Sequence, residues 1–578
     1  MKTTLEDSNV ELSHAQNLDR MLHAAMARAT SGLSPASLIA AYMDWFAHLS
    51  MSPGKRQRLL EKAVRKYNRL LIYAQSAAGL GNKCTPCIKP LLQDRRFAHP
   101  DWQRWPFNLL YQSFLLTQQW WYNATTGVRG VTPHHEQVVT FGARQLLDMV
   151  SPSNFLWTNP EVLGETCWTG GTNLWQGGLN LLQDWQRQSA GTKPAGAEAF
   201  QVGRDVAITS GKVVFRNGLM ELLQYSPVTA QVRPEPVLIV PSWIMRYYIL
   251  DLSPHNSLVN YLVSQGHTVF MISWKNPGAD DRDTGLRAYL NDGIMAALAS
   301  ICGIAPQRKI HSVGYCLGGT LLSIAAAAMA RDSDDRLAGV TLLAAETDFT
   351  QPGELSLFID ESQIAYIEDI MRDQGFLDGK QMAGTFALLN SRDLVWSRMV
   401  HDYLMGKRQP LTDLMAWNAD ATRLPCRMHS EYLRSLYLKN DLAEGRFEVG
   451  GKSVALTDVR VPLFVVGTER DHVSPWRSVY KIHLLTDTEV TFVLTSGGHN
   501  AGIVSEPGHR GRTYRIAKHR HGDKYTDPDT WHSAARCEEG SWWPAWQSWL
   551  VERSGQSIPS RRVADALEDA PGKYVLAP

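Results

Sequence analysis

Six short runs of mostly β-branched and other apolar residues recur along the second half of the chain, separated by stretches of helical character. They span residues 236–243, 267–274, 309–315, 338–348, 461–471 and 489–499. Strands of near-continuous apolar sequence are buried on both faces, and helices between them form the crossovers of a parallel sheet. The pattern therefore predicts an α/β fold. A long, mostly helical stretch at 349–460 interrupts it, is too long for a loop, and indicates an inserted helical cap.

The first 185 residues or so have a different, helical pattern. Ser34-Pro35 and Ser52-Pro53 each place an N-cap residue before a proline suited to the first helical turn. The stretch 188–199 is rich in Gly, Ala and Pro, as linkers are. We therefore expect a helical N-terminal domain over 1–190 and an α/β catalytic domain over 200–578, which includes the cap.

Composition excludes several classes of protein. The 578 residues carry a formal net charge of +1, which gives no overall attraction to nucleic acid or anionic membranes. The seven cysteines are odd in number and scattered, unlike a disulfide framework, and the one CxxC pair, Cys84 and Cys87, lacks the second pair of a zinc site. The N-terminus is polar, and the apolar run at 321–330 is shorter than the roughly 20 residues that span a bilayer. We expect an intracellular protein without a transmembrane segment or a metal.

The stretch "SVGYCLGG" has the form of a nucleophile turn. Gly314, Cys316 and Gly318 stand in a G-x-C-x-G arrangement between an apolar strand and a helix of small residues. Such a turn exposes the central side chain at a helix N-terminus, where the partial positive charge favours a thiolate. The backbone N–H of Leu317 would face a developing oxyanion. The alternative is a structural cysteine in a tight turn.

Two later strands end in groups that complete a catalytic triad in the order nucleophile, acid, histidine. Asp471 follows the run 461–471, and His499 lies in a glycine-rich loop after the last run. His499 would move protons and Asp471 would orient its ring. The competing candidates are His472 and the strand-terminal Asp348.

A second oxyanion donor is expected from the turn after the first apolar run. The backbone amides of Trp243 and Ile244 are the candidates, and sequence does not choose between them.

Beyond the nucleophile turn, the chain resembles the polyhydroxyalkanoate synthases, most of all the class I enzymes that work without a second type of subunit. The shared stretches are 94–116, 151–160 ("SPSNFLWTNP"), 165–171 ("ETCWTGG"), 241–277, 417–425 ("WNADATRLP"), 471–476 ("DHVSPW"), 540–550 and the final "PGKYVL". The resemblance covers residues from about 90 to 578.

The resemblance implies an α/β-hydrolase fold and an acyltransferase that polymerises (R)-3-hydroxyacyl-CoA into polyester with release of CoA. Cys316, Asp471 and His499 match the family's catalytic positions. The implied enzyme is a cytoplasmic homodimer at the surface of polymer granules, without a metal or organic cofactor. Short-chain monomers such as 3-hydroxybutyryl-CoA are the expected substrates. The basic segment 508–525 is a candidate contact for CoA phosphates, and a solvated basic loop is the alternative.

This chain departs from the family pattern at two positions near the expected site. Ser242 replaces the second residue of a usual double proline, and Asn500 follows His499 where an apolar residue is usual. Two other functions stay open: a cysteine-dependent acyl-CoA thioesterase or hydrolase, and a non-catalytic granule-associated protein.

Overall fold

The computed structural model describes residues 18–27, 30, 32–80, 85–91, 93–389, 391–563 and 566–577. The chain forms two compact units. The sheet unit consists of Met1–Gly32, Ala197–Met382 and Thr412–Pro578, and the helical unit of Leu33–Gly196 and Ala383–Leu411. The sequence-based domain boundaries stay a prediction; residues 383–411, which lie within the expected cap, belong to the helical unit.

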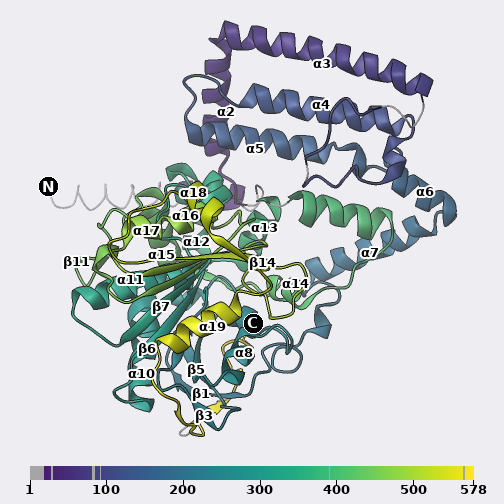
Figure 1. The fold of residues 1–578 in the computed structure, drawn as a ribbon. Coiled ribbons are helices and arrows are strands. Elements are labelled where there is room, and N and C mark those ends of the chain that lie inside the picture. The colour runs from purple at the N-terminus through teal and green to yellow at the C-terminus, as the bar shows by residue number, and fades with distance from the viewer. Residues whose placement is uncertain are drawn as a thin grey trace. The chain divides into compact units, whose positions relative to one another are not determined.

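The sheet unit is built around one mixed sheet of eleven strands (Figure 1). In spatial order the strands are β15 (Arg536–Glu539), β14 (Thr513–His519), β13 (Val490–Thr495), β12 (Leu463–Thr468), β7 (Leu337–Leu343), β6 (Ile310–Tyr315), β4 (Val237–Val240), β5 (Val269–Trp274), β2 (Met220–Tyr225), β1 (Gly211–Arg216) and β17 (Glu568–Asp569). Short two-stranded pairs are β10 (Glu448–Val449) with β11 (Lys452–Ser453), β16 (Ile558–Pro559) with β3 (Gln231–Val232), and β8 (Phe376–Leu377) with β9 (Leu424–Pro425).

The six predicted apolar runs form the parallel centre of this sheet. Strands β5, β4, β6, β7, β12 and β13 are consecutive neighbours and pair in parallel. Every residue of β4, β5, β6, β12 and β13 is buried, as continuous apolar runs require. The predicted parallel α/β sheet is confirmed. The strands outside this centre, β2, β1 and β17 on one side and β14 and β15 on the other, pair antiparallel.

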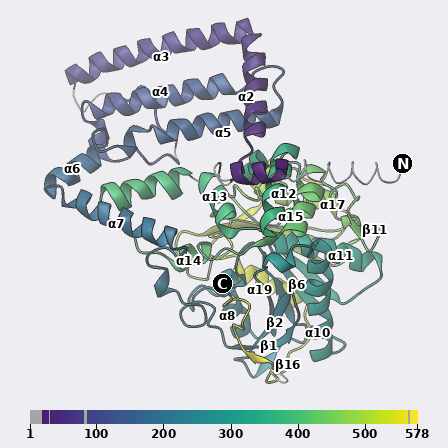
Figure 2. The ribbon, with the colours of Figure 1, turned by 180° about the vertical axis from the view of Figure 1, so that it is seen from behind.

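Helices cover both faces of the sheet (Figure 1 and Figure 2). Alternate residues of each strand point to opposite faces, so Leu238 and Val240 join one buried cluster while Val237 and Ile239 join the other. Helices α10 (Ala296–Ile304) and α11 (Leu317–Arg331) belong to the first cluster, and α8 (Leu258–Ser264) and α19 (Trp543–Glu552) to the second. Further α-helices of this unit are α9 (Leu286–Ala288), α12 (Glu361–Gln374), α14 (Asp413–Asn418), α15 (Cys426–Tyr432), α16 (Trp476–Tyr480), α17 (Ile482–Leu485) and α18 (Pro528–Ala534), and residues 18–27 are helical as well.

The helical unit consists mainly of α-helices, as its sequence pattern predicts. They are α2 (Pro35–Ser50), α3 (Pro53–Leu80), α4 (Phe107–Thr125), α5 (Pro133–Met149), α6 (Pro160–Trp168) and α7 (Thr172–Ser189), with the π-helical stretches η9 (Arg392–Trp396) and η10 (Met399–Leu404); α13 (Gly379–Leu389) contains the border between the units. Ser34 caps α2 as predicted, because its hydroxyl accepts a hydrogen bond from Ser37 N. Nowhere in the described part of the chain is a helix both long and apolar enough to cross a bilayer.

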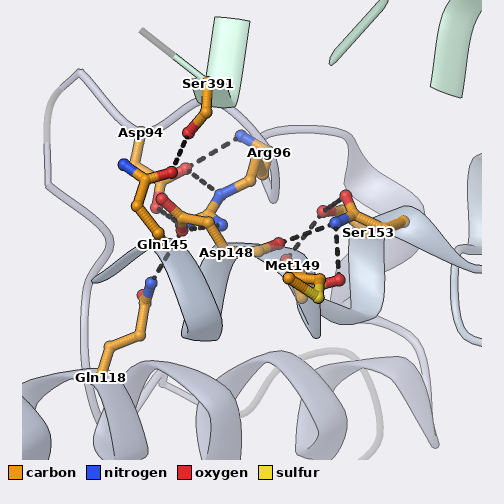
Figure 3. Close-up of polar contacts among 10 residues, drawn as sticks. Asp94, Arg96, Gln118, Gln145, Asp148, Met149, Ser153 and Ser391 are labelled. Carbon is orange, nitrogen blue, oxygen red and sulfur yellow. Dashed lines mark hydrogen bonds and ion pairs between the residues drawn. The ribbon is translucent and has the colours of Figure 1, made fainter. Parts of the chain in front are cut away.

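The helical unit contains a buried ionic cluster formed by Asp94, Arg96 and Asp148 (Figure 3). The Arg96 guanidinium donates to both carboxylate oxygens of Asp94, at 2.9 and 2.8 Å, and to Asp148 at 2.8 Å. Gln118 also donates to Asp148, and the side chains of Arg96 and both aspartates are less than a tenth exposed. Burial works against ionisation of Asp94, yet the guanidinium keeps its pKa below the usual value.

Candidate active site

Cys316 occupies the sharp turn predicted between a strand and a helix. Strand β6 ends at Tyr315 and α11 begins at Leu317, so Cys316 alone makes the turn, with φ 53° and ψ −122°. A positive φ is strained for a residue with a side chain, at a typical cost of about 1–3 kcal/mol. The hydrogen bond from Cys316 N to Leu343 O, 2.9 Å long, holds the turn against β7.

The three glycines of the turn allow this close packing. A Cβ atom on Gly318 would lie 2.1 Å from Val240 O, and one on Gly319 would lie 2.4 Å from the Cβ of Ala345. A Cβ on Gly314 would lie 2.3 Å from the Cα of Gly319. All three distances are far inside van der Waals contact, so the small residues around Cys316 are required by the geometry of the elbow.

His499 is fixed by Asp471, which projects from the loop after β12. His499 Nδ1 lies 2.8 Å from Asp471 Oδ2, and the same oxygen accepts from the Thr468 hydroxyl at 2.8 Å. The other oxygen, Oδ1, accepts from the backbone N–H groups of Val473 and Ser474 at 2.9 and 2.8 Å. Asp471 is 8% exposed and has hydrogen-bond donors at both oxygens, so its charge and its orientation are both fixed.

The electrostatics couple His499 to Cys316 as well as to Asp471. Burial alone would lower the pKa of His499, but the Asp471 carboxylate and a hydrogen-bonding interaction with Cys316 raise it well above 6.5. For Asp471, burial acts to raise the pKa, and the attraction of His499 and its hydrogen bonds outweigh this and lower it. Since Nδ1 faces Asp471, Nε2 is the nitrogen available to the thiol. The arrangement leaves His499 able to exchange a proton with the thiol through Nε2.

The two competing candidates lie apart from this pairing. Asp348 Oδ1 accepts from Thr350 N at 2.8 Å and lies 3.3 Å from Lys481 Nζ. His472 is exposed, and its carbonyl accepts from Glu354 N. The structure thus brings together Cys316, His499 and Asp471, and leaves out the alternatives.

The expected oxyanion donors differ in their surroundings. Leu317 N–H is at the first residue of α11 and, like Trp243 N–H, has no partner among the described residues. Ile244 N–H instead points to the Ser242 hydroxyl at 3.4 Å, a long hydrogen bond. Ser242, which replaces a proline in the family pattern, therefore competes for one of the candidate donors.

The second departure, Asn500, is part of a polar bridge beside the site. Its Oδ1 accepts from the Tyr315 hydroxyl at 2.5 Å, and its Nδ2 donates to Asn418 at 3.3 Å. The Tyr315 ring lies beside the His499 ring, with centroids 5.8 Å apart. An apolar residue at position 500 would leave the buried Tyr315 hydroxyl without this acceptor.

Sequence reasoning missed a second buried carboxyl, Glu346. It lies just after β7, is 4% exposed, and interacts electrostatically with Cys316, Asp471 and His499. Its position at the end of a central strand is a signal in the sequence, and Asp348, two residues later, shares it.

The basic segment 508–525, expected as a CoA contact or a solvated loop, contains strand β14 (Thr513–His519), and its remaining residues form turns and coil. In β14, Tyr514 and Ile516 pack on one buried cluster and Ala517 on the other, so a solvated loop does not describe this part of the segment. Lys518 pairs with Glu489, and Arg515 donates to a backbone carbonyl. Cys84 lies outside the described residues, and among those described no group of three or more His, Cys, Asp or Glu could hold a metal.

The fold and site define a class of protein: an α/β-hydrolase fold with cysteine at the nucleophile turn. Residues 235–506 match the family described as "alpha/beta hydrolase fold". Residues 93–262 match "Poly-beta-hydroxybutyrate polymerase (PhaC) N-terminus", and residues 13–55 match "Poly-beta-hydroxybutyrate polymerase N terminal".

Curated relatives cover nearly the whole chain. The chain is 40% identical to "Poly(3-hydroxyalkanoate) polymerase" of Methylorubrum extorquens, over 89% of this chain and 87% of that protein. It is 37% identical to "Poly(3-hydroxyalkanoate) polymerase subunit PhaC" of Rhizobium meliloti (83% and 79% covered), and 34% identical to the protein of that name in Cupriavidus necator (93% and 90% covered). The chain belongs to the poly(3-hydroxyalkanoate) polymerase family, whose members are transferases. The predicted family is confirmed.

Proposed function

We propose that this protein polymerises (R)-3-hydroxyacyl-CoA into polyester, with Cys316 as nucleophile, His499 as acid and base, and Asp471 as the residue that orients His499. The observation that carries the proposal is the site itself: a cysteine on a strained strand–helix turn, coupled to a histidine that is held by a buried aspartate 2.8 Å away. Family membership supports polyester synthesis as the outcome.

Acylation begins with the thiolate–imidazolium pair. Cys316 Sγ attacks the thioester carbonyl carbon, and negative charge forms on the carbonyl oxygen. Leu317 N–H, with Trp243 or Ile244 N–H, stabilises that oxygen. The carbon–sulfur bond to CoA then breaks, and the imidazolium of His499 gives its proton to the CoA sulfur.

Elongation uses the same groups in the reverse order. The neutral His499 takes the proton of a 3-hydroxyl group, whose oxygen attacks the acyl-thioester carbon on Cys316. An ester bond forms, the bond to Cys316 Sγ breaks, and the thiolate–imidazolium pair returns. Each cycle balances in protons, and Asp471 stabilises the imidazolium without changing its own charge.

A thiol suits this sequence better than a hydroxyl does. Attack on acyl-CoA exchanges one thioester for another, so the acyl group stays activated for the next transfer. A serine ester would lose most of that activation before the chain is extended. The nucleophile turn therefore carries the same geometry as a hydrolase elbow, with chemistry suited to transfer.

The finer assignments rest on the resemblance to class I enzymes. We propose a homodimer that acts in the cytoplasm at the granule surface and prefers short-chain monomers such as 3-hydroxybutyryl-CoA. We also propose that the 349–460 insert excludes water from the acyl-enzyme. Tyr432 and Tyr437, which interact electrostatically with Cys316, come from this segment.

The test is incubation of purified protein with 3-hydroxybutyryl-CoA, followed by measurement of released CoA and insoluble polymer. Cys316→Ala should abolish both while the protein still folds. Cys537→Ala is the matched control, because Cys537 is a free, exposed cysteine of β15, and it should behave as the native protein. Competition between C4 and longer substrates tests chain-length preference.

Two results would replace the proposal by its alternatives. Free 3-hydroxybutyrate without polymer would indicate a thioesterase or hydrolase. If the protein releases no CoA and substrate does not label Cys316, the result would indicate a non-catalytic granule-associated protein.

A further inference from the structure

The turn that follows β4 lies directly against the nucleophile turn. Val240 pairs with Gly314 in the parallel ladder of β4 and β6, so both strands end at the same edge of the sheet. A Cβ atom on Gly318 would lie 2.1 Å from Val240 O and 2.6 Å from Pro241 O. The stretch that starts at Pro241 is therefore in backbone contact with the helix whose first residue, Leu317, supplies the expected oxyanion donor.

Thr422 holds this turn through two hydrogen bonds. Its hydroxyl donates to Trp243 O at 2.5 Å, and its backbone N–H donates to Ile244 O at 3.0 Å. The preceding residue, Ala421, forms an antiparallel bridge with Met245, which continues the contact along the chain. Thr422 is 3% exposed and Trp243 is 4% exposed, so solvent does not readily replace the hydroxyl as the donor to this carbonyl.

The contact with the Thr422 hydroxyl sets the direction of one candidate oxyanion donor, Ile244 N–H. Trp243 O and Ile244 N–H belong to the same planar, trans peptide group, so they point in opposite directions. A carbonyl held toward Thr422 therefore holds the N–H on the other side, and the hydrogen bond also polarises the peptide group and strengthens the N–H as a donor. The contact of this N–H with the Ser242 hydroxyl, at 3.4 Å, is long and can be exchanged for an oxyanion.

The other candidate, Trp243 N–H, lacks such a restraint. It shares its peptide group with Ser242 O, and none of the donors in the described part of the chain reaches that oxygen. The peptide group before it is held, because Pro241 O accepts from Trp274 Nε1 at 2.9 Å. Of the two candidate amides, Ile244 is thus the one whose direction is set by a side chain.

We propose that Thr422 is a positioning residue that fixes Ile244 N–H as the second oxyanion donor, beside Leu317 N–H. The inference rests on the proposed role of Cys316 as nucleophile, and it chooses between two amides that the reaction steps leave open. Thr422 acts through the peptide group rather than on the sulfur. Its loss should weaken the stabilisation of a negatively charged oxygen and leave the thiol itself unchanged.

The ketone S-trifluoroacetonyl-CoA tests this without turnover. Cys316 Sγ adds to the ketone carbon, the carbonyl π bond breaks, and its electron pair goes to the oxygen, which the N–H donors then stabilise. Iodoacetamide alkylates the same sulfur by displacing iodide, and no oxyanion forms. We expect Thr422→Val and Thr422→Ala to weaken ketone binding by about 10- to 100-fold and to leave the alkylation rate within about twofold. With 3-hydroxybutyryl-CoA, kcat should fall by a similar factor while KM changes little.

Two further variants separate positioning from stability. Thr422→Ser keeps the hydroxyl and should bind the ketone within about threefold of the native affinity. Thr488→Val is the matched control, because Thr488 is 7% exposed and its hydroxyl donates to the carbonyls of Arg460 and Val461 at 3.1 and 3.2 Å, just before β13. It should lower the thermal midpoint as Thr422→Val does, with no loss of ketone affinity.

The possible failures are distinguishable. Native ketone affinity in Thr422→Val and Thr422→Ala, a loss that Thr422→Ser shares, or an equal fall in the alkylation rate would overturn the inference. A native protein that forms no ketone adduct at Cys316 would refute the nucleophile assignment and the inference with it. An adduct that depends on Thr422, in a protein that forms no polymer, would refute the proposed polymerisation alone.

Discussion

Replacing Asp471 by asparagine tests the proposed site with almost no change in shape. In the native protein Oδ2 faces His499 Nδ1 at 2.8 Å, while Oδ1 accepts two backbone N–H groups. Those N–H groups will hold the amide oxygen of asparagine, so its NH2 group must take the place of Oδ2 and face His499. That NH2 group donates a hydrogen bond and cannot accept one, so His499 must present an unprotonated Nδ1 to it. The proton then sits on Nε2, where it blocks acceptance of the thiol proton.

The expected loss follows from both the wrong tautomer and the missing charge. We expect CoA release from 3-hydroxybutyryl-CoA to fall by roughly 10³–10⁴-fold, equivalent to about 4–5.5 kcal/mol of transition-state stabilisation. The pH at which iodoacetamide alkylation of the thiol is half-maximal should also rise, because the imidazolium that accompanies the thiolate loses its stabilising carboxylate. Asp348→Asn is the matched control and should change neither quantity. Activity of Asp471→Asn within tenfold of the native rate would refute the assignment of Asp471.

Three further predictions concern the oxyanion turn, the helical unit and the response to acid. Ser242→Ala frees Ile244 N–H, and we expect CoA release to rise about two- to threefold, as the loss of one long, competing hydrogen bond allows; an unchanged rate would assign the second donor to another amide. Arg96→Met leaves two buried carboxylates unpaired and should lower the free energy of urea unfolding of the helical unit by about 3–5 kcal/mol. Arg104→Met, at an exposed ion pair, should lower it by less than about 1 kcal/mol. Equal losses in the two variants would contradict the effect expected for Arg96. Burial lowers the pKa of three histidines to about 4, so below pH 6.5 the unfolded chain binds more protons than the native protein does. The free energy of unfolding should therefore decrease between pH 6.5 and 4, by on the order of 1–3 kcal/mol for each histidine. A thermal midpoint that stays constant from pH 7 to pH 5 would falsify this. These histidines are His267, His311 and His429.

The sequence allowed the centre of the sheet to be predicted, but not its edges. All six apolar runs form parallel strands, because a strand that is buried on both faces must be apolar along its whole length. Strand β14 is half-buried and mixes Tyr514 and Ile516 with arginine and lysine. Its basic residues therefore suggested a CoA contact or a solvated loop rather than a strand. Strand β17 is two residues long and is defined by its antiparallel pairing with β1. The local sequence does not indicate this pairing, because the partner strand is distant in the chain.

The site followed the same division between local and tertiary information. The turn around Cys316 could be predicted because its glycines are adjacent in sequence and each is required by a close contact. The choice of Asp471 over Asp348 rested on its position after a late strand, and the hydrogen bond to His499 distinguishes them physically. The hydrogen bond from Ile244 N–H to Ser242 depends on how the turn folds, so no sequence pattern reveals it. The strand-terminal position of Glu346 is visible in the sequence, but its burial depends on tertiary packing.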